Sequence, residues 1–204
     1  MGKQIEAASA AKARGIAKAK AIAPARAARI GSTPQTSLRG EPAIFGRLIE
    51  DHDRHRALFA MVDDSKAGSD EHATLFTELT RELKSHAAAE EQALWSSVLR
   101  NPETTDDGRH AVAEHKQIDD MLDDLAARDR AKKGWAKRFA ALKEKYLHHL
   151  REEEQEQFVN AEATLTTADK KYMLGVFNRR KREEKAAATP TPKIRLKPVV
   201  ASAD

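Results

Sequence analysis

The chain has 204 residues, a formal net charge of +4, 33% charged residues and 5% aromatic residues, which is enough for one packed domain with tails. It contains no cysteine, so disulfides and thiolate metal sites are excluded, and any bound metal must have nitrogen and oxygen ligands. No apolar run approaches the roughly 20 residues of a membrane span, and no apolar stretch typical of a secretory signal follows the N-terminus, so we expect a cytoplasmic protein without membrane contact.

The charge is segregated along the chain. Residues 1–40 hold eight Lys or Arg and one acid, residues 41–169 hold 18 basic and 28 acidic residues, and residues 170–204 hold ten and three. We interpret residues 1–40 as a disordered basic arm and residues 187–204, which contain three prolines, as a disordered tail. For the arm, three roles stay open: a solvated tail, a weak nucleic-acid contact through phosphates, and a targeting peptide.

Apolar residues at helical spacing predict four helices in the central part of the chain. The first begins at Pro42 and runs to about Asp64, and the second follows a capping serine, Ser69, and stops before residue 101. A third helix begins near Thr105. Gly134 is the only breaker between it and the fourth helix.

A further helix is expected at residues 165–186, where Thr166 and Asp169 resemble a capping pair and a run of basic residues follows. The predicted fold is therefore all-α. It is an antiparallel up-down four-helix bundle at residues 41–164, with a short, basic C-terminal extra helix and disordered basic tails.

Each of the four main helices carries a histidine on its apolar face, and two of these histidines are followed one turn later by a glutamate. The six residues are His52, His86, Glu90, His115, His149 and Glu153. Four imidazoles and two carboxylates that converge inside a bundle would form a two-metal site. The two His-Glu segments also match beyond these residues, because a second glutamate follows each glutamate and an aromatic residue follows each histidine at the ninth position.

Neighbouring histidines compete with two members of this set. His52 is preferred over His55, and His149 over His148, because more of their neighbours at helical spacing are apolar. His110 and His72 are expected to be exposed. The alternative for each inward histidine taken singly is a hydrogen-bonded core residue without metal.

The two inward glutamates favour metal. A buried carboxylate without a counter-charge is costly, and the apolar stripes show no obvious inward Lys or Arg. A pair of divalent cations would supply that charge, and mixed imidazole and carboxylate ligands suit iron, manganese or zinc better than calcium or magnesium.

At these residues the chain resembles the hemerythrin-like (HHE cation-binding) domain family, roughly over residues 42–162. The matching stretches are Leu48-Ile49-Glu50-Asp51-His52, His86-Ala-Ala-Ala-Glu90-Glu91, Glu114-His115-Lys116-Gln117-Ile118 and His149-Leu-Arg-Glu-Glu153-Glu154. The resemblance implies a non-heme di-iron centre with the six residues as ligands and two iron ions, with or without an oxo or hydroxo bridge.

The chain departs from the oxygen-carrying members of that family at two positions. Asp119 stands where they are expected to have a second histidine, and Glu154 stands where they have an aspartate, which weakens the expectation of reversible oxygen storage. Asp119 is either a further ligand, a group that holds an imidazole N–H, or a solvated acid.

Two functions follow as hypotheses. The first is a di-iron protein that binds, senses or detoxifies oxygen, nitric oxide or peroxide, or that senses or stores iron. If it is an enzyme, it is an oxidoreductase that processes peroxide or oxygen, but no catalytic residue is identified. The alternative is a nucleic-acid-associated protein that acts through its basic arms, with the bundle as a structural or sensory core.

Overall fold

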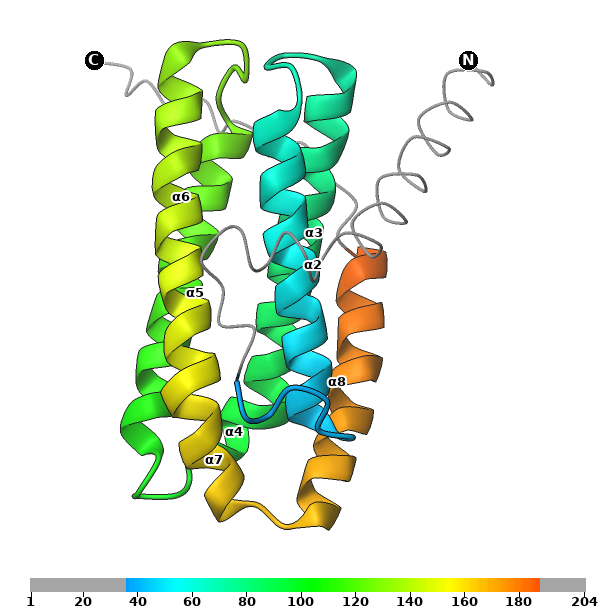
Figure 1. The fold of residues 1–204 in the computed structure, drawn as a ribbon, viewed down its shortest axis with the longest axis vertical. Helices are drawn as coiled ribbons and strands as arrows, with labels where there is room; N and C mark the ends of the chain where they lie inside the picture. Colours follow the sequence, from blue (N-terminus) through cyan, green and yellow to red (C-terminus); the bar gives the residue numbers. More distant parts are fainter. Residues whose placement is uncertain (1–35, 188–204) are drawn as a thin grey trace, which may run out of the picture.

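The computed structural model describes residues 36–187, all of whose regular elements are helical (Figure 1). Of the arm predicted at residues 1–40, residues 1–35 lie outside this range, and of the tail predicted at residues 187–204, residues 188–204 do. The sequence predicts that residues 36–40 are disordered, but they pack on the bundle, because Leu38 joins the apolar core and Arg39 forms an ion pair with Asp53. The elements are α2 (Ile44–Asp64), α3 (Asp70–Glu90), η1 (Glu91–Trp95), α4 (Ser96–Val98), α5 (Thr105–Ala126), α6 (Lys133–Glu152), η2 (Glu153–Gln157), α7 (Phe158–Thr164) and α8 (Thr167–Ala187).

Four rods form an antiparallel up-down bundle, as the sequence predicted (Figure 1). They are α2, the continuous run from α3 through η1 to α4, α5, and the continuous run from α6 through η2 to α7. Both η segments are π-helical turns, in which the hydrogen bonds span five residues and one extra residue is accommodated. Short loops join successive rods, so neighbours in sequence are neighbours in space. Within residues 36–187, no helix is long and apolar enough to span a membrane.

The helix ends follow local chemistry. The hydroxyl of Ser69 accepts a hydrogen bond from the backbone N–H of His72 at 3.1 Å, and Gly68 before it has a φ of 76°, which favours glycine. At α8, Thr166 and Asp169 cap each other reciprocally, with N···O distances of 3.0 and 3.2 Å. The third and fourth helices are separated at residues 127–132, so Gly134 lies in the first turn of α6 and is not the breaker.

The apolar core is divided in two by a polar layer. One cluster lies toward the end where α2 finishes and contains Phe59, Phe76, Leu79, Leu122, Trp135 and Phe139. The other lies toward the start of α2 and contains Phe45, Leu48, Leu94, Trp95, Phe158 and Phe177. Between the two clusters each rod contributes a buried histidine, and most of the other buried side chains there are carboxylates. The bundle therefore encloses a layer of polar and charged side chains between two apolar clusters.

Helix α8 has 21 residues, at Thr167–Ala187, where the sequence predicts a helix at residues 165–186. It packs along α2 and α3 (Figure 1), where Met173, Val176 and Phe177 join the second apolar cluster. Phe177 is fully buried, and one basic residue of the C-terminal run, Lys181, is buried as well. The fifth helix is thus part of the bundle and covers one side of the polar layer.

Candidate metal centre

The structure brings the six predicted residues together in the polar layer. His52 comes from α2, His86 and Glu90 from α3, His115 from α5, His149 from α6, and Glu153 from the start of η2. All six are at most 5% exposed. That they bind metal remains a prediction.

The bundle has two halves, one formed by α2 and α3 with His52 and His86, the other by α5 and α6 with His115 and His149. The two glutamates lie between the histidines of these halves. The nearer carboxylate oxygen of Glu90 is 3.4 Å from Nε2 of His86 and 3.6 Å from Nε2 of His115. Glu153 lies 3.4 Å from Nε2 of His149 and 3.4 Å from Nε2 of His52. Each carboxylate therefore reaches imidazoles from both halves, which is the placement that a bridging ligand requires.

Several nitrogen and oxygen atoms in this layer that could bind a metal have no hydrogen-bond partner. They are both carboxylate oxygens of Glu90, both of Glu153, and Nε2 of His115. The Nε2 atoms of His52 and His86 face each other at 3.2 Å, and His115, His149 and Glu153 each offer an atom within 4.8 Å of the others. Buried polar atoms are normally paired, so unpaired nitrogen and oxygen donors at this spacing fit a pair of divalent cations.

Every histidine of the set is held on its other ring nitrogen by a carboxylate. The Nδ1 atom lies 2.9 Å from Glu154 in His52 and 3.3 Å from Asp51 in His86. The corresponding distances are 3.0 Å to Glu91 in His115 and 2.9 Å to Glu114 in His149. A carboxylate acceptor fixes the hydrogen on Nδ1, so the lone pair of each Nε2 is directed into the layer.

These four carboxylates follow a repeated pattern in the sequence. In α2 and α5 an acid, Asp51 or Glu114, directly precedes the histidine. In the rods that begin with α3 and α6, a second glutamate, Glu91 or Glu154, directly follows the inner glutamate. The helix pair α2 and α3 thus repeats as α5 and α6. Sequence reasoning noticed the second glutamates but missed the role of Asp51 and Glu114, although each is adjacent to a predicted ligand.

The π-helical turns begin where the glutamates lie. η1 starts one residue after Glu90, and η2 starts at Glu153 itself. An added residue rotates the following side chains relative to a regular helix, so Glu90 and Glu91 can serve the same layer while Trp95 still reaches the core. The equivalent aromatic residue of the second half, Phe158, stacks on Trp95 at 6.0 Å between ring centroids. Single π turns of this kind occur frequently at functional sites.

Two buried cations correct the expectation that no Lys or Arg points inward. Arg56 is fully buried and lies 2.8 Å from Glu154 and 3.2 Å from Asp53. Lys181 of α8 pairs with Asp51 and lies 3.0 Å from Glu82. Both cations neutralise acids around the layer, and neither is within ion-pair distance of the inner glutamates. The need for a compensating charge at Glu90 and Glu153 therefore stands.

The charge state of the layer reflects its burial. Burial raises the pKa of Glu153 well above its usual range, and the nearby Glu90 adds to this effect. Burial is also the largest single effect on Glu90, but the histidines around it, His86 above all, together outweigh burial and lower the pKa of Glu90 to about 2. For His149, burial lowers the pKa to about 4 despite its bond to Glu114. Without metal, the imidazole of His149 thus stays neutral at neutral pH, and burial opposes the ionisation of Glu153 beside the ionised Glu90.

The residues that competed with the set take other places. His55 is fully buried, and its Nδ1 lies 2.7 Å from the hydroxyl of Tyr146. The side chain of His148 is 52% exposed and contacts Glu152. Asp119 is 44% exposed and pairs with Lys84, so its carboxylate is turned away from the histidines. His110 is exposed as expected.

The expectation for His72 was wrong. This residue is buried because its ring packs against Trp135 of α6, with 4.8 Å between ring centroids. The contact joins two helices that are distant in sequence, so the apolar periodicity of α3 alone could not reveal it.

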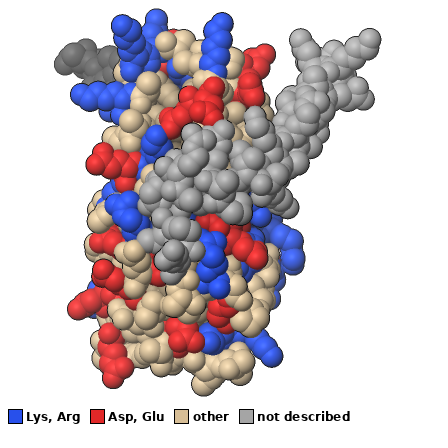
Figure 2. Space-filling model, in the orientation of Figure 1, with Lys and Arg blue, Asp and Glu red and all other residues tan. Residues whose placement is uncertain are grey.

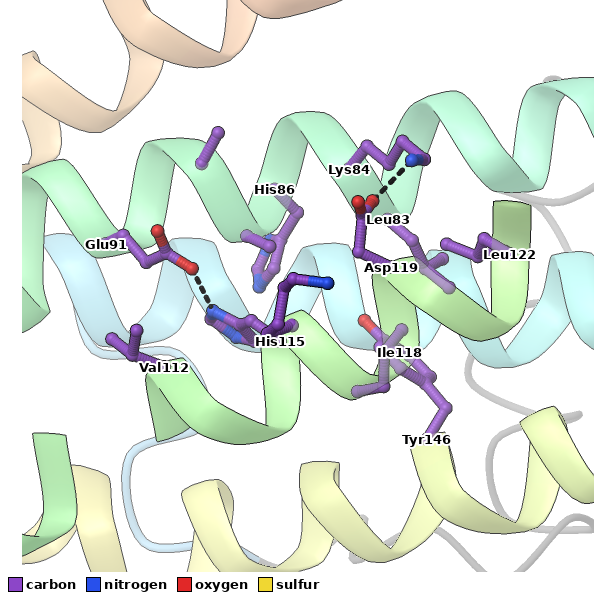
Figure 3. A pocket seen from close by; sticks show the side chains of 13 residues that line it. Leu83, Lys84, His86, Glu91, Val112, His115, Ile118, Asp119, Leu122 and Tyr146 are labelled. Atoms are coloured by element: carbon purple, nitrogen blue, oxygen red, sulfur yellow. Dashed lines mark hydrogen bonds and ion pairs between the residues drawn. The ribbon is translucent and has the colours of Figure 1, made fainter. Parts of the chain in front are cut away.

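A pocket with a volume of about 360 Å³ lies between α3 and α5 and reaches the layer (Figure 3). His86, His115 and Tyr146 are among its lining residues. Figure 3 shows the Lys84–Asp119 pair and the Glu91–His115 contact along its length. Both His86 and His115 are therefore approached from the side of the bundle between α3 and α5, whereas α8 covers the layer along α2 and α3.

A model of the hemerythrin HHE cation binding domain matches residues 43–159, which is more than half of the chain. The chain belongs to the hemerythrin HHE cation-binding family. This HHE protein is accordingly a metal-binding, hemerythrin-like helical bundle. Its fold is similar to the crystal structure of a hemerythrin HHE cation binding domain-containing protein from Mycobacterium kansasii, with a TM-score of 0.61 and 20% sequence identity over 71% of this chain and 88% of that one. No curated protein sequence matches the HHE protein.

Proposed function

We propose that this protein holds two iron ions and uses them to bind a small oxidant or diatomic ligand, namely oxygen, nitric oxide or peroxide. One observation carries the proposal: the four oxygens of Glu90 and Glu153 lie unpaired among four imidazoles whose Nε2 atoms face inward. A purely structural polar layer would satisfy these oxygens with hydrogen bonds.

The donor set supports iron as the metal. Imidazole with carboxylate suits iron, manganese and zinc, whereas calcium and magnesium prefer shells of oxygen alone. Six side chains shared between two cations leave coordination positions for exogenous ligands. Bound iron would supply one-electron chemistry and open positions for small molecules. The residues of the chain orient the imidazoles, hold Glu90 and Glu153 between the halves, and exclude bulk water.

The pocket supports a small ligand. Apolar side chains of Leu83, Val112 and Ile118 line it together with the Lys84–Asp119 pair. Because Asp119 is engaged by Lys84, its carboxylate is not available as a further donor next to His115. The part of the layer that the pocket reaches thus has fewer protein ligands than a site with a second histidine at the position of Asp119 would have, which favours binding of a small molecule there.

The test is the metal content and optical spectrum of the full chain purified from iron-supplemented cells. We expect about two iron ions per chain and near-ultraviolet charge-transfer absorption, both lost in Glu90→Ala and in Glu153→Ala. Glu156→Gln, an exposed change in the same π turn as Glu153, is the matched control. Iron-free protein that is stable and colourless would overturn the proposal.

A second measurement separates the candidate ligands. The iron-loaded protein is mixed in turn with azide, nitric oxide, hydrogen peroxide and oxygen, and the spectral change is followed. Val112→Trp, which fills the pocket, should slow these reactions roughly tenfold or more without changing the iron content. Equal rates in the variant and the wild type would show that ligands do not use this pocket.

The nucleic-acid alternative stays a prediction, because its arms lie outside the described residues. In the described part of the C-terminal run, Lys181 and Lys185 are directed to Glu82, and Arg180 pairs with Glu184. Figure 2 shows acidic and basic side chains interspersed over the visible face. Salt-dependent DNA binding that is lost when residues 1–40 and 186–204 are deleted would support the alternative.

A further inference from the structure

A second cluster of metal-binding side chains lies on the outside of the bundle, between α5 and α6. The chain has eight histidines, and six of them are buried. The two exposed ones are His110 of α5 and His148 of α6, whose side chains are 53% and 52% exposed. Both contact the same carboxylate, that of Glu152.

The distances in this cluster are those of a chelating site. Nε2 of His110 is 3.2 Å from one oxygen of Glu152, and Nε2 of His148 is 3.4 Å from the other. Nε2 of His110 is also 3.7 Å from Oε2 of Glu114. Atoms of His110, Glu114 and Glu152 lie within 4.8 Å of one another. Ligand atoms that each lie roughly 2.0 to 2.1 Å from one tetrahedral cation are separated by about 3.3 Å, so small adjustments would close the site.

The backbone already fixes most of the geometry. His110 and Glu114 are one turn apart on α5, and His148 and Glu152 are one turn apart on α6, so each pair shares a helix face. Packing of the two helices brings the faces together. No loop has to be ordered for a cation to bind.

We propose that this cluster is a separate site for one divalent transition-metal cation of the zinc or ferrous type. His110 and Glu152 supply the ligands on the surface, and His148 contacts the other oxygen of Glu152. Glu114 contributes its Oε2 from below, and the same oxygen lies 2.9 Å from Nδ1 of His149. The outer cation is thus separated from the buried layer by one carboxylate. The imidazole of His110 favours a transition metal over calcium and magnesium.

One positive charge opposes binding. The ammonium of Lys145 pairs with the other oxygen of Glu114. This ion pair lowers the repulsion between the carboxylates of Glu114 and Glu152, but it also reduces the negative charge available to a bound cation. The outer site is therefore expected to bind more weakly than the buried one, and it is independent of whether the buried layer holds iron.

The test is the zinc stoichiometry of the full chain, measured by equilibrium dialysis after chelation and saturation with Zn²⁺. Wild type should bind one more zinc ion per chain than His110→Gln and Glu152→Gln, whatever number fills the buried layer. Binding to this site should weaken roughly tenfold or more in each variant. Glu156→Gln, an exposed neighbour on the same helical rod, should match wild type.

Chemical modification provides a second measurement. Diethyl pyrocarbonate should modify the two exposed histidines in zinc-free protein, and zinc should protect His110. Since the changed side chains are partly exposed, the variants should unfold at the wild-type temperature. Equal zinc counts in wild type and the variants, or modification that zinc does not reduce, would overturn the proposal.

Discussion

Replacing Glu153 with glutamine should stabilise the metal-free protein and weaken the metal-loaded one. In the absence of metal, the carboxyl group of Glu153 is fully buried, both of its oxygens lack hydrogen-bond partners, and its pKa is raised because it is buried beside Glu90. An unsatisfied buried polar group costs about 1–3 kcal/mol. Glutamine has nearly the same shape and leaves a polar amide with a similar cost, but it cannot ionise. The metal-free variant therefore avoids the penalty for ionising a buried carboxyl, which amounts to about 1.4 kcal/mol for each pH unit by which the pKa is raised, and should gain about 1–3 kcal/mol in the free energy of unfolding at neutral pH.

The pH dependence of this gain follows from the direction of the pKa shift. A raised pKa means that the folded protein keeps a proton which the unfolded chain releases above the ordinary value of 4.5. The stability of metal-free wild type therefore falls as pH rises above 4.5, by up to about 1.4 kcal/mol per pH unit, until the buried carboxyl ionises. The glutamine variant lacks this dependence, so the difference between the two proteins should grow with pH.

Urea unfolding followed by circular dichroism would measure both effects, with and without iron and at several pH values. Iron should stabilise wild type by binding the folded state, and the variant should lose most of that gain. Glu156→Gln, in the same π turn but exposed, controls for a general effect of removing charge. The reasoning is wrong if Glu153→Gln lowers the stability of the metal-free protein, or if its effect is independent of pH.

Three further predictions concern the surroundings of the layer. Lys181→Met should lower the free energy of unfolding by about 3 kcal/mol, because it leaves buried acids without their cation, whereas the exposed Arg182→Met should change it by less than about 0.5 kcal/mol in the same urea assay; similar effects would contradict the buried pairing. Glu91→Ala should weaken iron binding about tenfold, measured by competition with a chelator, since it removes the acceptor that orients His115; unchanged affinity would argue against this role. Ser69→Ala should reduce stability by about 1 kcal/mol in thermal unfolding because α3 loses its N-terminal cap, and an unchanged melting temperature would refute that assignment.

The helices and the inner residues could be predicted because their signals are local. Apolar spacing, the Ser69 cap and the Thr166–Asp169 pair each depend on residues within two turns of one another, and the structure contains all of these elements. The same spacing placed His52 and His86 on inward faces. Local periodicity thus suffices wherever one helix face is buried by the bundle itself.

The missed features depend on partners from distant parts of the chain. Arg56 lies one turn after His52 and so shares its face, but a guanidinium is normally assigned to solvent. Its shorter ion pair inside the bundle is with Glu154, about a hundred residues away, and the local acid Asp53 alone does not indicate burial. Lys181 is buried because α8 docks on α2 and α3, which its basic composition does not suggest. The π turns at Glu90 and Glu153 leave no mark in the apolar pattern, because an inserted residue is visible only in the backbone.

The repetition of α2 and α3 as α5 and α6 has a consequence for how such a centre could originate or be built. Each helical hairpin carries an acid directly before its first histidine and two glutamates one turn after its second histidine. One hairpin therefore holds half of the metal-binding side chains. It holds only half of the contacts that orient its own histidines, because Glu91 and Glu154 each contact a histidine of the opposite half. Two identical hairpins related by a twofold axis would close the whole centre. The chain is thus equivalent to a fused homodimer, and a designer could obtain the same donor set from a peptide of half the length.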